Sequence, residues 1–368
     1  MTMQSPFPYD KLSLGTTFIG RQGEIDKLNQ VIDSGNNLLL FSKRRLGKSS
    51  LIKKVFEQRT DDVCLYCDVY DITRKEDFSR ILLKSLSSFG VKKSWLSWMT
   101  GVAKRLKVEM TIDPNSGKYA LKPTIGALDF DGQMSEFFAA IDALSEQKRV
   151  VIALDEFQQV DAVKDIRMDA YLRKYIQARN NRVSFIFSGS KRHILTSMFG
   201  YHAPLYEMAT HHELQPLVFD AIKDYVTQYL TIDDNALHHI CTLADNETKL
   251  MQNVFHLLYV QHRKMPITIN LVDDVLTEII NEKQATFRLI YDGFSNSQKM
   301  AIKIVAKYEQ GFYTAEALQQ EGISKSALQA AIKQLFAREI IDRNQDSYFI
   351  PDRTLELWVK RLAANASA

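Results

Sequence analysis

The chain has 368 residues, 45% of them hydrophobic and 25% charged, which is the composition of a globular protein with room for two or three domains. Its formal net charge of +3 is too small to indicate a nucleic-acid-binding protein by itself. The sequence has neither an apolar run of the roughly 18–20 residues that a membrane helix needs nor a secretion signal, and its three cysteines suggest a reducing compartment, so we expect a cytoplasmic protein.

The first predicted elements surround a short basic loop. After an N-terminal extension, residues 1–16, apolar side chains recur at helical spacing over residues 24–32. An apolar strand is expected at 37–41, and a second amphipathic helix at 49–59. The loop at 42–47 therefore connects a buried strand directly to a helix.

This loop ends in Gly47-Lys48-Ser49, as in the phosphate-binding fingerprint G-x-x-x-x-G-K-[ST]. Gly47 lets the backbone come close to phosphates, and N–H groups at a helix start point toward negative charge. Lys48 can reach the β- and γ-phosphates, while the Ser49 hydroxyl can ligate Mg²⁺. Ser42 stands where the fingerprint has its first glycine, so the loop entry is the weakest part of the match.

The predicted nucleotide site extends over the whole loop and the first turn of the helix. Its expected contacts are Ser42, Arg44, Arg45, Leu46, Gly47, Lys48, Ser49 and Ser50. The basic side chains at 43–45 could contact phosphates or face a partner, and simple solvent exposure is an equal alternative for the first two.

A second strand is expected at 63–70, and it contains Cys64 and Cys67. In a strand these two side chains point to opposite faces, and no second ligand pair has the spacing of a zinc site. We therefore interpret the cysteines as structural. An amphipathic helix follows at about 78–89. Beyond it, residues 107–112 alternate between apolar and polar, residues 113–117 favour a turn, and residues 118–122 could return as a second strand. This pattern predicts a β-hairpin insertion at about 106–123.

Two further apolar strands are expected at 149–154 and 183–190, with helices at 137–144 and 165–178. Apolar runs separated by helices predict a parallel sheet covered on both faces, as in a three-layer α/β P-loop NTPase core. Ligands bind such sheets at the carboxyl ends of the strands. The loop at 42–47 and the polar residues after both new strands lie at such ends.

The strand at 149–154 leads into Asp155 and Glu156. A phosphoryl-transfer site needs one acid for Mg²⁺ and gains from a neighbour that orients or deprotonates water, and these two acids fit the two roles in that order. A solvated turn is the alternative. Ser188 or Ser190, after the next strand, could bind the γ-phosphate, although short polar residues commonly end strands.

The C-terminal part has a different pattern. Residues 218–290 are expected to be wholly helical. Helices at 297–308, 314–320 and 324–339, followed by a short hairpin around 344–346, describe a winged-helix module. A final helix is expected at 352–362. The helix at 324–339 would be the recognition helix, but nearby acids dilute its positive charge. DNA and protein therefore both stay open as partners.

Four segments together resemble the archaeal-type ATPases, a group close to the STAND and AAA+ ATPases: 18–21, 43–49, 154–158 and 187–190. Segments 203–206, 213–217 and 349–352 are similar too. The resemblance implies a core at 17–217, a helical lid at 218–290, a winged helix at 291–368, ATP binding and Mg²⁺-dependent hydrolysis that rearranges these parts. A homo-oligomer, with an arginine supplied by a neighbouring chain, stays open.

Three departures from that family bear on turnover. Ser42 replaces its first glycine, Glu207 and Met208 stand where the family usually has Gly-Arg, and 246–249 replaces a Gly-x-Pro turn. We therefore expect slow hydrolysis, or binding without hydrolysis. A nucleotide-dependent signalling or scaffold protein and an ATP-regulated DNA-binding protein are the alternatives.

Overall fold

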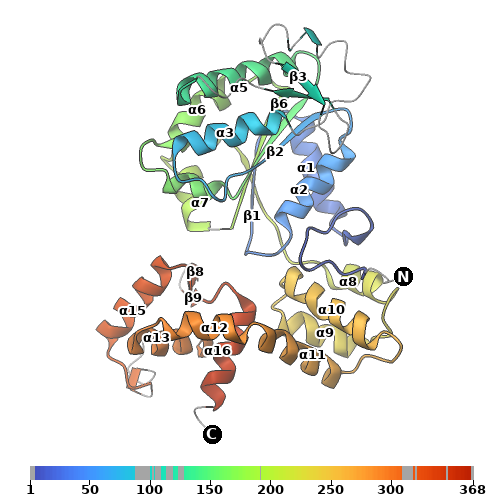
Figure 1. The fold of residues 1–368 in the computed structure, drawn as a ribbon, viewed down its shortest axis with the longest axis vertical. Helices are drawn as coiled ribbons and strands as arrows, with labels where there is room; N and C mark the ends of the chain where they lie inside the picture. Colours follow the sequence, from blue (N-terminus) through green and yellow to red (C-terminus); the bar gives the residue numbers. More distant parts are fainter. Residues whose placement is uncertain are drawn as a thin grey trace. The chain divides into compact units, whose positions relative to one another are not determined.

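The computed structural model describes residues 5–87, 100–101, 103, 109–112, 119–122, 128–190, 192–308, 318–319, 321–344 and 347–365. The chain divides into two compact units. One is Leu12–Gln215, and the other joins Met1–Lys11 to Pro216–Ala368. The first unit contains the large sheet, and the second contains the helices of the C-terminal half (Figure 1).

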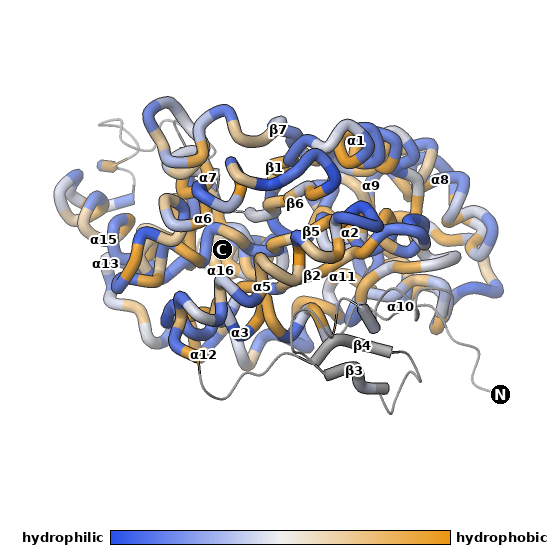
Figure 2. The backbone as a smooth tube through the Cα atoms, turned by 90° about the horizontal axis from the view of Figure 1, so that it is seen from above, coloured by the Kyte–Doolittle hydropathy of each residue, from blue (hydrophilic) through white to orange (hydrophobic). Residues whose placement is uncertain are grey.

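The first unit is built on a five-stranded parallel sheet in the order β2-β5-β6-β1-β7. Its strands are β1 (Leu38–Phe41), β2 (Val63–Asp68), β5 (Val150–Asp155), β6 (Val183–Gly189) and β7 (Thr210–Glu213). β5 and β6 are buried along their whole length, which explains their continuous apolar sequence. In Figure 2 the helices instead alternate between hydrophobic and hydrophilic residues.

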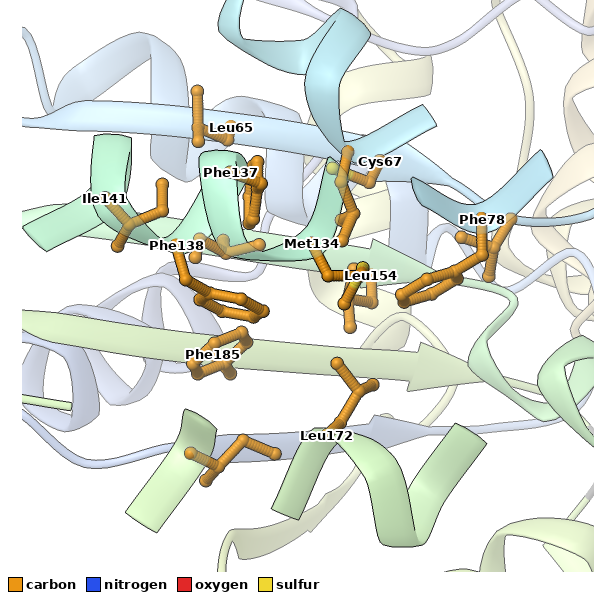
Figure 3. Close-up of a cluster of buried hydrophobic side chains, with 14 of the residues drawn as sticks. Leu65, Cys67, Phe78, Met134, Phe137, Phe138, Ile141, Leu154, Leu172 and Phe185 are labelled. Carbon is orange, nitrogen blue, oxygen red and sulfur yellow. The ribbon is translucent and has the colours of Figure 1, made fainter. Parts of the chain in front are cut away.

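Helices cover both faces of this sheet. One face packs against α1 (Gln22–Asp33) and α2 (Lys48–Gln58). The other face packs against α3 (Lys75–Leu86), α5 (Phe130–Ser145), α6 (Met168–Ala178) and α7 (Arg192–Phe199). Figure 3 shows the second cluster, in which Phe138 of α5 lies beside Phe185 of β6, and Phe137 of α5 and Leu154 of β5 belong to the same cluster. The predicted three-layer α/β core is confirmed.

The strand β7 was not expected from the sequence. It is an edge strand that pairs only with β1 in this sheet, and three of its four residues are exposed. Exposed edge strands lack the apolar run that marks a buried strand. The link that holds it is polar, because the Asn37 side chain donates to the Met208 carbonyl at 2.7 Å and the Asn37 carbonyl accepts from Thr210 at 2.9 Å.

The predicted hairpin insertion is present as an antiparallel pair, β3 (Glu109–Ile112) and β4 (Tyr119–Lys122). Its expected turn at 113–117 lies outside the described residues. Short 3-10 helices at Gly15–Thr17 and Phe157–Ala162 complete the described elements of this unit. None of the helices that the structure describes combines the length and the apolarity needed to span a bilayer.

The second unit is mainly helical. Its helices are α8 (Phe219–Val226), α9 (Asp234–Leu243), α10 (Thr248–His262), α11 (Ile269–Glu282), α12 (Gln284–Asp292), α13 (Asn296–Lys307), α15 (Lys325–Ala337) and α16 (Arg353–Asn365). A two-stranded hairpin, β8 (Asp342–Asn344) with β9 (Ser347–Phe349), follows α15. The expected helix at 314–320 lies outside the described residues except at 318–319, so the winged helix stays a prediction.

Phe7 of the N-terminal extension belongs to the core of this second unit. Phe7 is 1% exposed, and its ring lies 5.5 to 6.1 Å from those of Tyr225, Tyr229, Phe255 and Tyr259. The Tyr225 hydroxyl also donates to the Pro6 carbonyl at 2.8 Å. The extension is therefore packed among the helices α8 and α10, which the sequence pattern did not predict.

Candidate nucleotide site

The carboxyl ends of three strands bring polar side chains to one face of the sheet. Ala153 and Ile186 pack on the face that α1 and α2 cover, so the residues two positions further along face the same way. These residues are Asp155 and Ser188, and the Ser188 hydroxyl donates to Asp155. The predicted strand-end residues thus lie together beside the start of α2.

The loop before α2 turns through two residues with left-handed backbone, Arg45 at φ 65° and Gly47 at φ 95°. A Cβ on Gly47 would meet nothing within 4 Å, so there is open space at this point. The first hydrogen bond of the helix joins the Leu51 N–H to the Gly47 carbonyl at 2.9 Å. The N–H groups of residues 48–50 consequently have no acceptor within the helix and suit an anion.

Ser42 does not carry the strain that its motif position suggested. It is not among the residues with positive φ, so the missing glycine is not required there for backbone reasons. Its amide donates to the Gly189 carbonyl at 3.4 Å, which continues the pairing of β1 with β6. The left-handed position of this loop entry is Arg45 instead.

Lys48, the first residue of α2, is a buried cation whose side chain reaches back to the start of the loop. Its side chain is 5% exposed, and Nζ donates to Ser42 Oγ at 3.2 Å and to a backbone carbonyl of the loop at 3.4 Å. Burial lowers the pKa of Lys48, the negative charges of Glu156 and Asp155 partly offset this, and Arg44 lowers the pKa further. An ammonium group held in this way is suited to bind a polyanion.

The other residues of the predicted loop site differ in how deeply they are buried. Leu46 is part of the core under α1 and α2, and Ser50 is also buried. Arg44 and Arg45 are half-buried. Their contacts with a nucleotide stay a prediction.

Asp155 is 2% exposed and accepts four hydrogen bonds. Oδ2 accepts from Ser49 Oγ at 2.5 Å and from the Tyr66 hydroxyl. Oδ1 accepts from the Ser188 hydroxyl and from the Glu156 N–H at 3.1 Å. Because a carboxylate has about four lone-pair sites, these four donors fill them and fix the group.

Glu156 is held by a second, smaller network. Its backbone is left-handed, with φ 56° and ψ 40°, and its Oε2 accepts from the Gln158 amide and from Ser190 Oγ at 3.3 Å. Gln158 is 1% exposed. Sequence reasoning placed Glu156 at the site but missed Gln158, although it lies in the segment 154–158 that carries the family resemblance.

The strand β2 adds two residues that sequence reasoning also missed, Tyr66 and Asp68. Asp68 lies directly beside Asp155 in the parallel register of β2 and β5. Burial raises the pKa of Asp68, the N–H of Tyr70 lowers it, and the negative charges of Asp155 and Glu156 raise it again. Strand period two could have suggested both residues, because Tyr66 and Asp68 share one face of β2 near its carboxyl end.

The cysteines play no part in this site. Cys64 and Cys67 pack on opposite faces of β2, as predicted, and burial raises the pKa of each thiol to about 12. Across the part of the chain that the structure describes, no group of three or more His, Cys, Asp or Glu side chains could hold a metal ion by itself.

Arg21 connects this loop to the end of the first unit. Its guanidinium donates to the Leu46 carbonyl at 3.0 Å and to the Gln215 carbonyl at 2.8 Å. It also pairs with Glu24 at 2.9 Å. Arg21 belongs to the segment 18–21 that carries part of the family resemblance, and its bond to the Leu46 carbonyl supports the backbone of the loop before α2.

No protein-family model and no curated protein sequence matches this chain. Solved structures do match it. The Walker-type ATPase PABY2304 of Pyrococcus abyssi superposes with a TM-score of 0.67 at 16% identity, over 97% of this chain and 100% of its own. The chain has the fold of a P-loop ATPase. The ORC2 protein of Aeropyrum pernix, solved as ADPNP–ADP complexes, gives a TM-score of 0.50 at 13% identity over 99% of this chain and 98% of its own.

The P-loop ATPase fold explains why the site residues converge. With β1 between β6 and β7, the loop after β1 lies beside the ends of β6 and β5, where Ser188 and Asp155 stand. The archaeal Walker-type ATPase among these structures also agrees with the resemblance seen in the sequence. The shared fold covers both units of the chain, since nearly all residues are included.

Proposed function

We propose that the chain binds ATP with Mg²⁺ at the loop between β1 and α2 and hydrolyses it. The observation that carries the proposal is the 2.5 Å hydrogen bond between Ser49 and Asp155, which are 106 positions apart in sequence. It brings a hydroxyl and a carboxylate together beside the buried ammonium group of Lys48. Oxygen donors of these types are the ones that Mg²⁺ prefers.

The residues present fit a triphosphate. The N–H groups of residues 48–50 and the open space at Gly47 would receive phosphate oxygens, and Lys48 would bind the β- and γ-phosphates. Ser49 and Asp155 would hold Mg²⁺, which neutralises phosphate charge when it is bound. The structural similarity to a protein solved as ADPNP–ADP complexes supports nucleotide binding.

Glu156 would orient or deprotonate the attacking water. Gln158 and Ser190 donate to its carboxylate and define its position. Ser188, proposed to bind the γ-phosphate, donates to Asp155. It would have to exchange this acceptor for a phosphate oxygen.

A second candidate function is a nucleotide-dependent signalling or scaffold protein with little turnover. The observation that favours it is the same pair of hydrogen bonds to Glu156, because a carboxylate engaged by Gln158 and Ser190 is less available to a water molecule. In either case we propose that nucleotide state is passed to the lid, 218–290, and to the winged-helix region, 291–368. A DNA or protein partner would bind this last region.

Binding and turnover can be tested separately. Lys48→Ala should abolish ATP binding in calorimetry, whereas Lys54→Ala, on the same helix, should bind ATP normally. An unchanged affinity in Lys48→Ala would remove the proposal. Glu156→Gln should bind ATP but release no phosphate, and full activity in this variant would reassign the base.

Phosphate release by the unmodified protein distinguishes the two candidate functions. Steady release supports the ATPase, and binding without release supports the signalling or scaffold protein. Repeating the assay with DNA tests the partner, since stimulation that weakens as salt rises is expected for contacts to the phosphate backbone.

A further inference from the structure

We infer that the Tyr66 hydroxyl is a positioning group for the magnesium site, where it fixes Asp155 and, through Asp155, the Ser49 hydroxyl. The inference rests on the proposed function, because it assigns a further residue to the same site. None of the sequence motifs includes Tyr66. Its placement follows from the pairing of β2 with β5.

Three contacts hold the Tyr66 side chain in place. Its ring packs against the core under α1 and α2, and Lys53 Nζ of α2 lies 4.4 Å from the ring centroid. Its hydroxyl donates to Oδ2 of Asp155, the oxygen that also accepts from Ser49. The ring is therefore anchored between strand and helix, and the hydroxyl is directed at the predicted metal-binding pair.

The hydroxyl is a permanent donor at this position. A tyrosine hydroxyl carries its proton at neutral pH and a carboxylate oxygen can only accept, so Tyr66 supplies an O–H donor to Oδ2 of Asp155.

The geometry around Asp155 indicates how Mg²⁺ would be held. All four lone-pair sites of the carboxylate have donors, so Asp155 can ligate the ion directly only by losing one of them. Asp155 would instead act through the Ser49 hydroxyl and through water bound to the metal. Removing the Tyr66 donor leaves Oδ2 with one partner and allows the carboxylate to rotate away from Ser49. Partners of this type commonly tune metal affinity by about 10- to 100-fold.

A packing role and a positioning role make different predictions for Tyr66→Phe. The ring, its place in the core and its contact with Lys53 are all available to phenylalanine. Only the hydroxyl is lost. The variant therefore tests the donor without opening a cavity.

The experiment measures ATP affinity by calorimetry, first in EDTA and then across a Mg²⁺ titration, for the unmodified full chain, Tyr66→Phe and the control Tyr70→Phe. Tyr70 is an exposed tyrosine just beyond the same strand. We expect Tyr66→Phe to keep its metal-free ATP affinity and a cooperative thermal transition, with a slightly lower melting temperature because the buried carboxylate loses one donor, and to need about tenfold more Mg²⁺ for half-maximal tightening of ATP binding. Tyr70→Phe should behave like the unmodified chain.

An unchanged Mg²⁺ requirement in Tyr66→Phe, with normal ATP binding, would overturn this inference and leave the proposed function intact. A lower melting temperature together with weaker metal-free binding would overturn it too, because Tyr66 would then be structural. Failure of the unmodified chain to bind ATP with or without Mg²⁺ would overturn the proposed function itself.

Discussion

The buried amide of Gln158 lies directly against Gly189, where a Cβ would come within 2.0 Å of the amide oxygen. The same amide donates to Glu156 through its nitrogen. Glycine at the end of β6 therefore makes room for the side chain that holds the proposed catalytic acid. This close approach, and not a turn, is the reason for glycine at this position.

Gly189→Ala should consequently displace Gln158 and release Glu156. Overpacking of this kind costs about 1–3 kcal/mol of stability. We expect a lower free energy of unfolding and a changed rate of phosphate release, with ATP affinity retained. The control is Gly23→Ala in α1, where a Cβ would meet nothing within 4 Å and alanine should stabilise the helix slightly.

The pH dependence of ATP binding should report the protonation of Lys48. Burial lowers its pKa in the free protein, and a bound triphosphate would raise it again. Below the free-protein pKa, Lys48 is already charged and this group adds no pH dependence. Above it, binding takes up a proton, so affinity should fall by up to about tenfold per pH unit.

Calorimetry in two buffers of different ionisation enthalpy measures this proton uptake. Lys48→Arg provides the comparison, because arginine stays charged and should lose the uptake if the variant still binds ATP. Proton release on ATP binding at high pH, or an affinity that does not change there, would contradict the assignment.

Asn37 should be among the most sensitive polar residues for stability. Its side chain is 4% exposed, donates to the Met208 carbonyl, and accepts from Arg179 and from the Phe185 N–H, both at 3.0 Å. Asn37→Ala leaves these groups without their partner, so we expect a loss of at least about 2 kcal/mol in chemical denaturation.

The adjacent Asn36 is exposed and provides the matched control. Asn36→Ala should change the free energy of unfolding by no more than about 0.5 kcal/mol. Equal effects from the two substitutions would mean that the Asn37 network does not stabilise the edge of the sheet.

Much of the fold could be predicted because fully buried parallel strands have continuous apolar sequences. β1, β2, β5 and β6 were all expected within two residues of their observed bounds. β7 was not, because an exposed edge strand held by backbone pairing and by Asn37 has no such run. The burial of Phe7 was also missed, since a single aromatic residue has no periodicity to reveal its partners.

Some residues of the candidate site could also be predicted from the sequence, and others could not. The sequence could predict that the loop before α2 lies near Asp155 and Glu156, because the phosphate-binding motif requires fixed residue types at fixed spacing and parallel strands end at one edge of the sheet; the roles of these residues stay a prediction. Tyr66 and Gln158 could not be predicted, because their roles depend on the register of β2 with β5 and on the close approach to Gly189. Such relationships exist only after the strands have paired.

Arg21 should not tolerate replacement by lysine, because its guanidinium bridges the carbonyls of Leu46 and Gln215. A lysine has a single donor group and cannot reproduce a planar fork with two separate acceptors. Arg21→Lys should therefore loosen the phosphate loop and weaken ATP binding about tenfold, as measured by calorimetry, while the free energy of unfolding falls by about 1–3 kcal/mol.

Arg80→Lys is the control for this substitution. Arg80 has a 56% exposed side chain and pairs with Asp77 on the surface of α3, so its replacement should leave both quantities unchanged. If Arg21→Lys lowered stability without weakening ATP binding, Arg21 would serve only the packing of the first unit. A loss of affinity in the variant at temperatures where it is fully folded would instead show that the bridge shapes the phosphate loop itself.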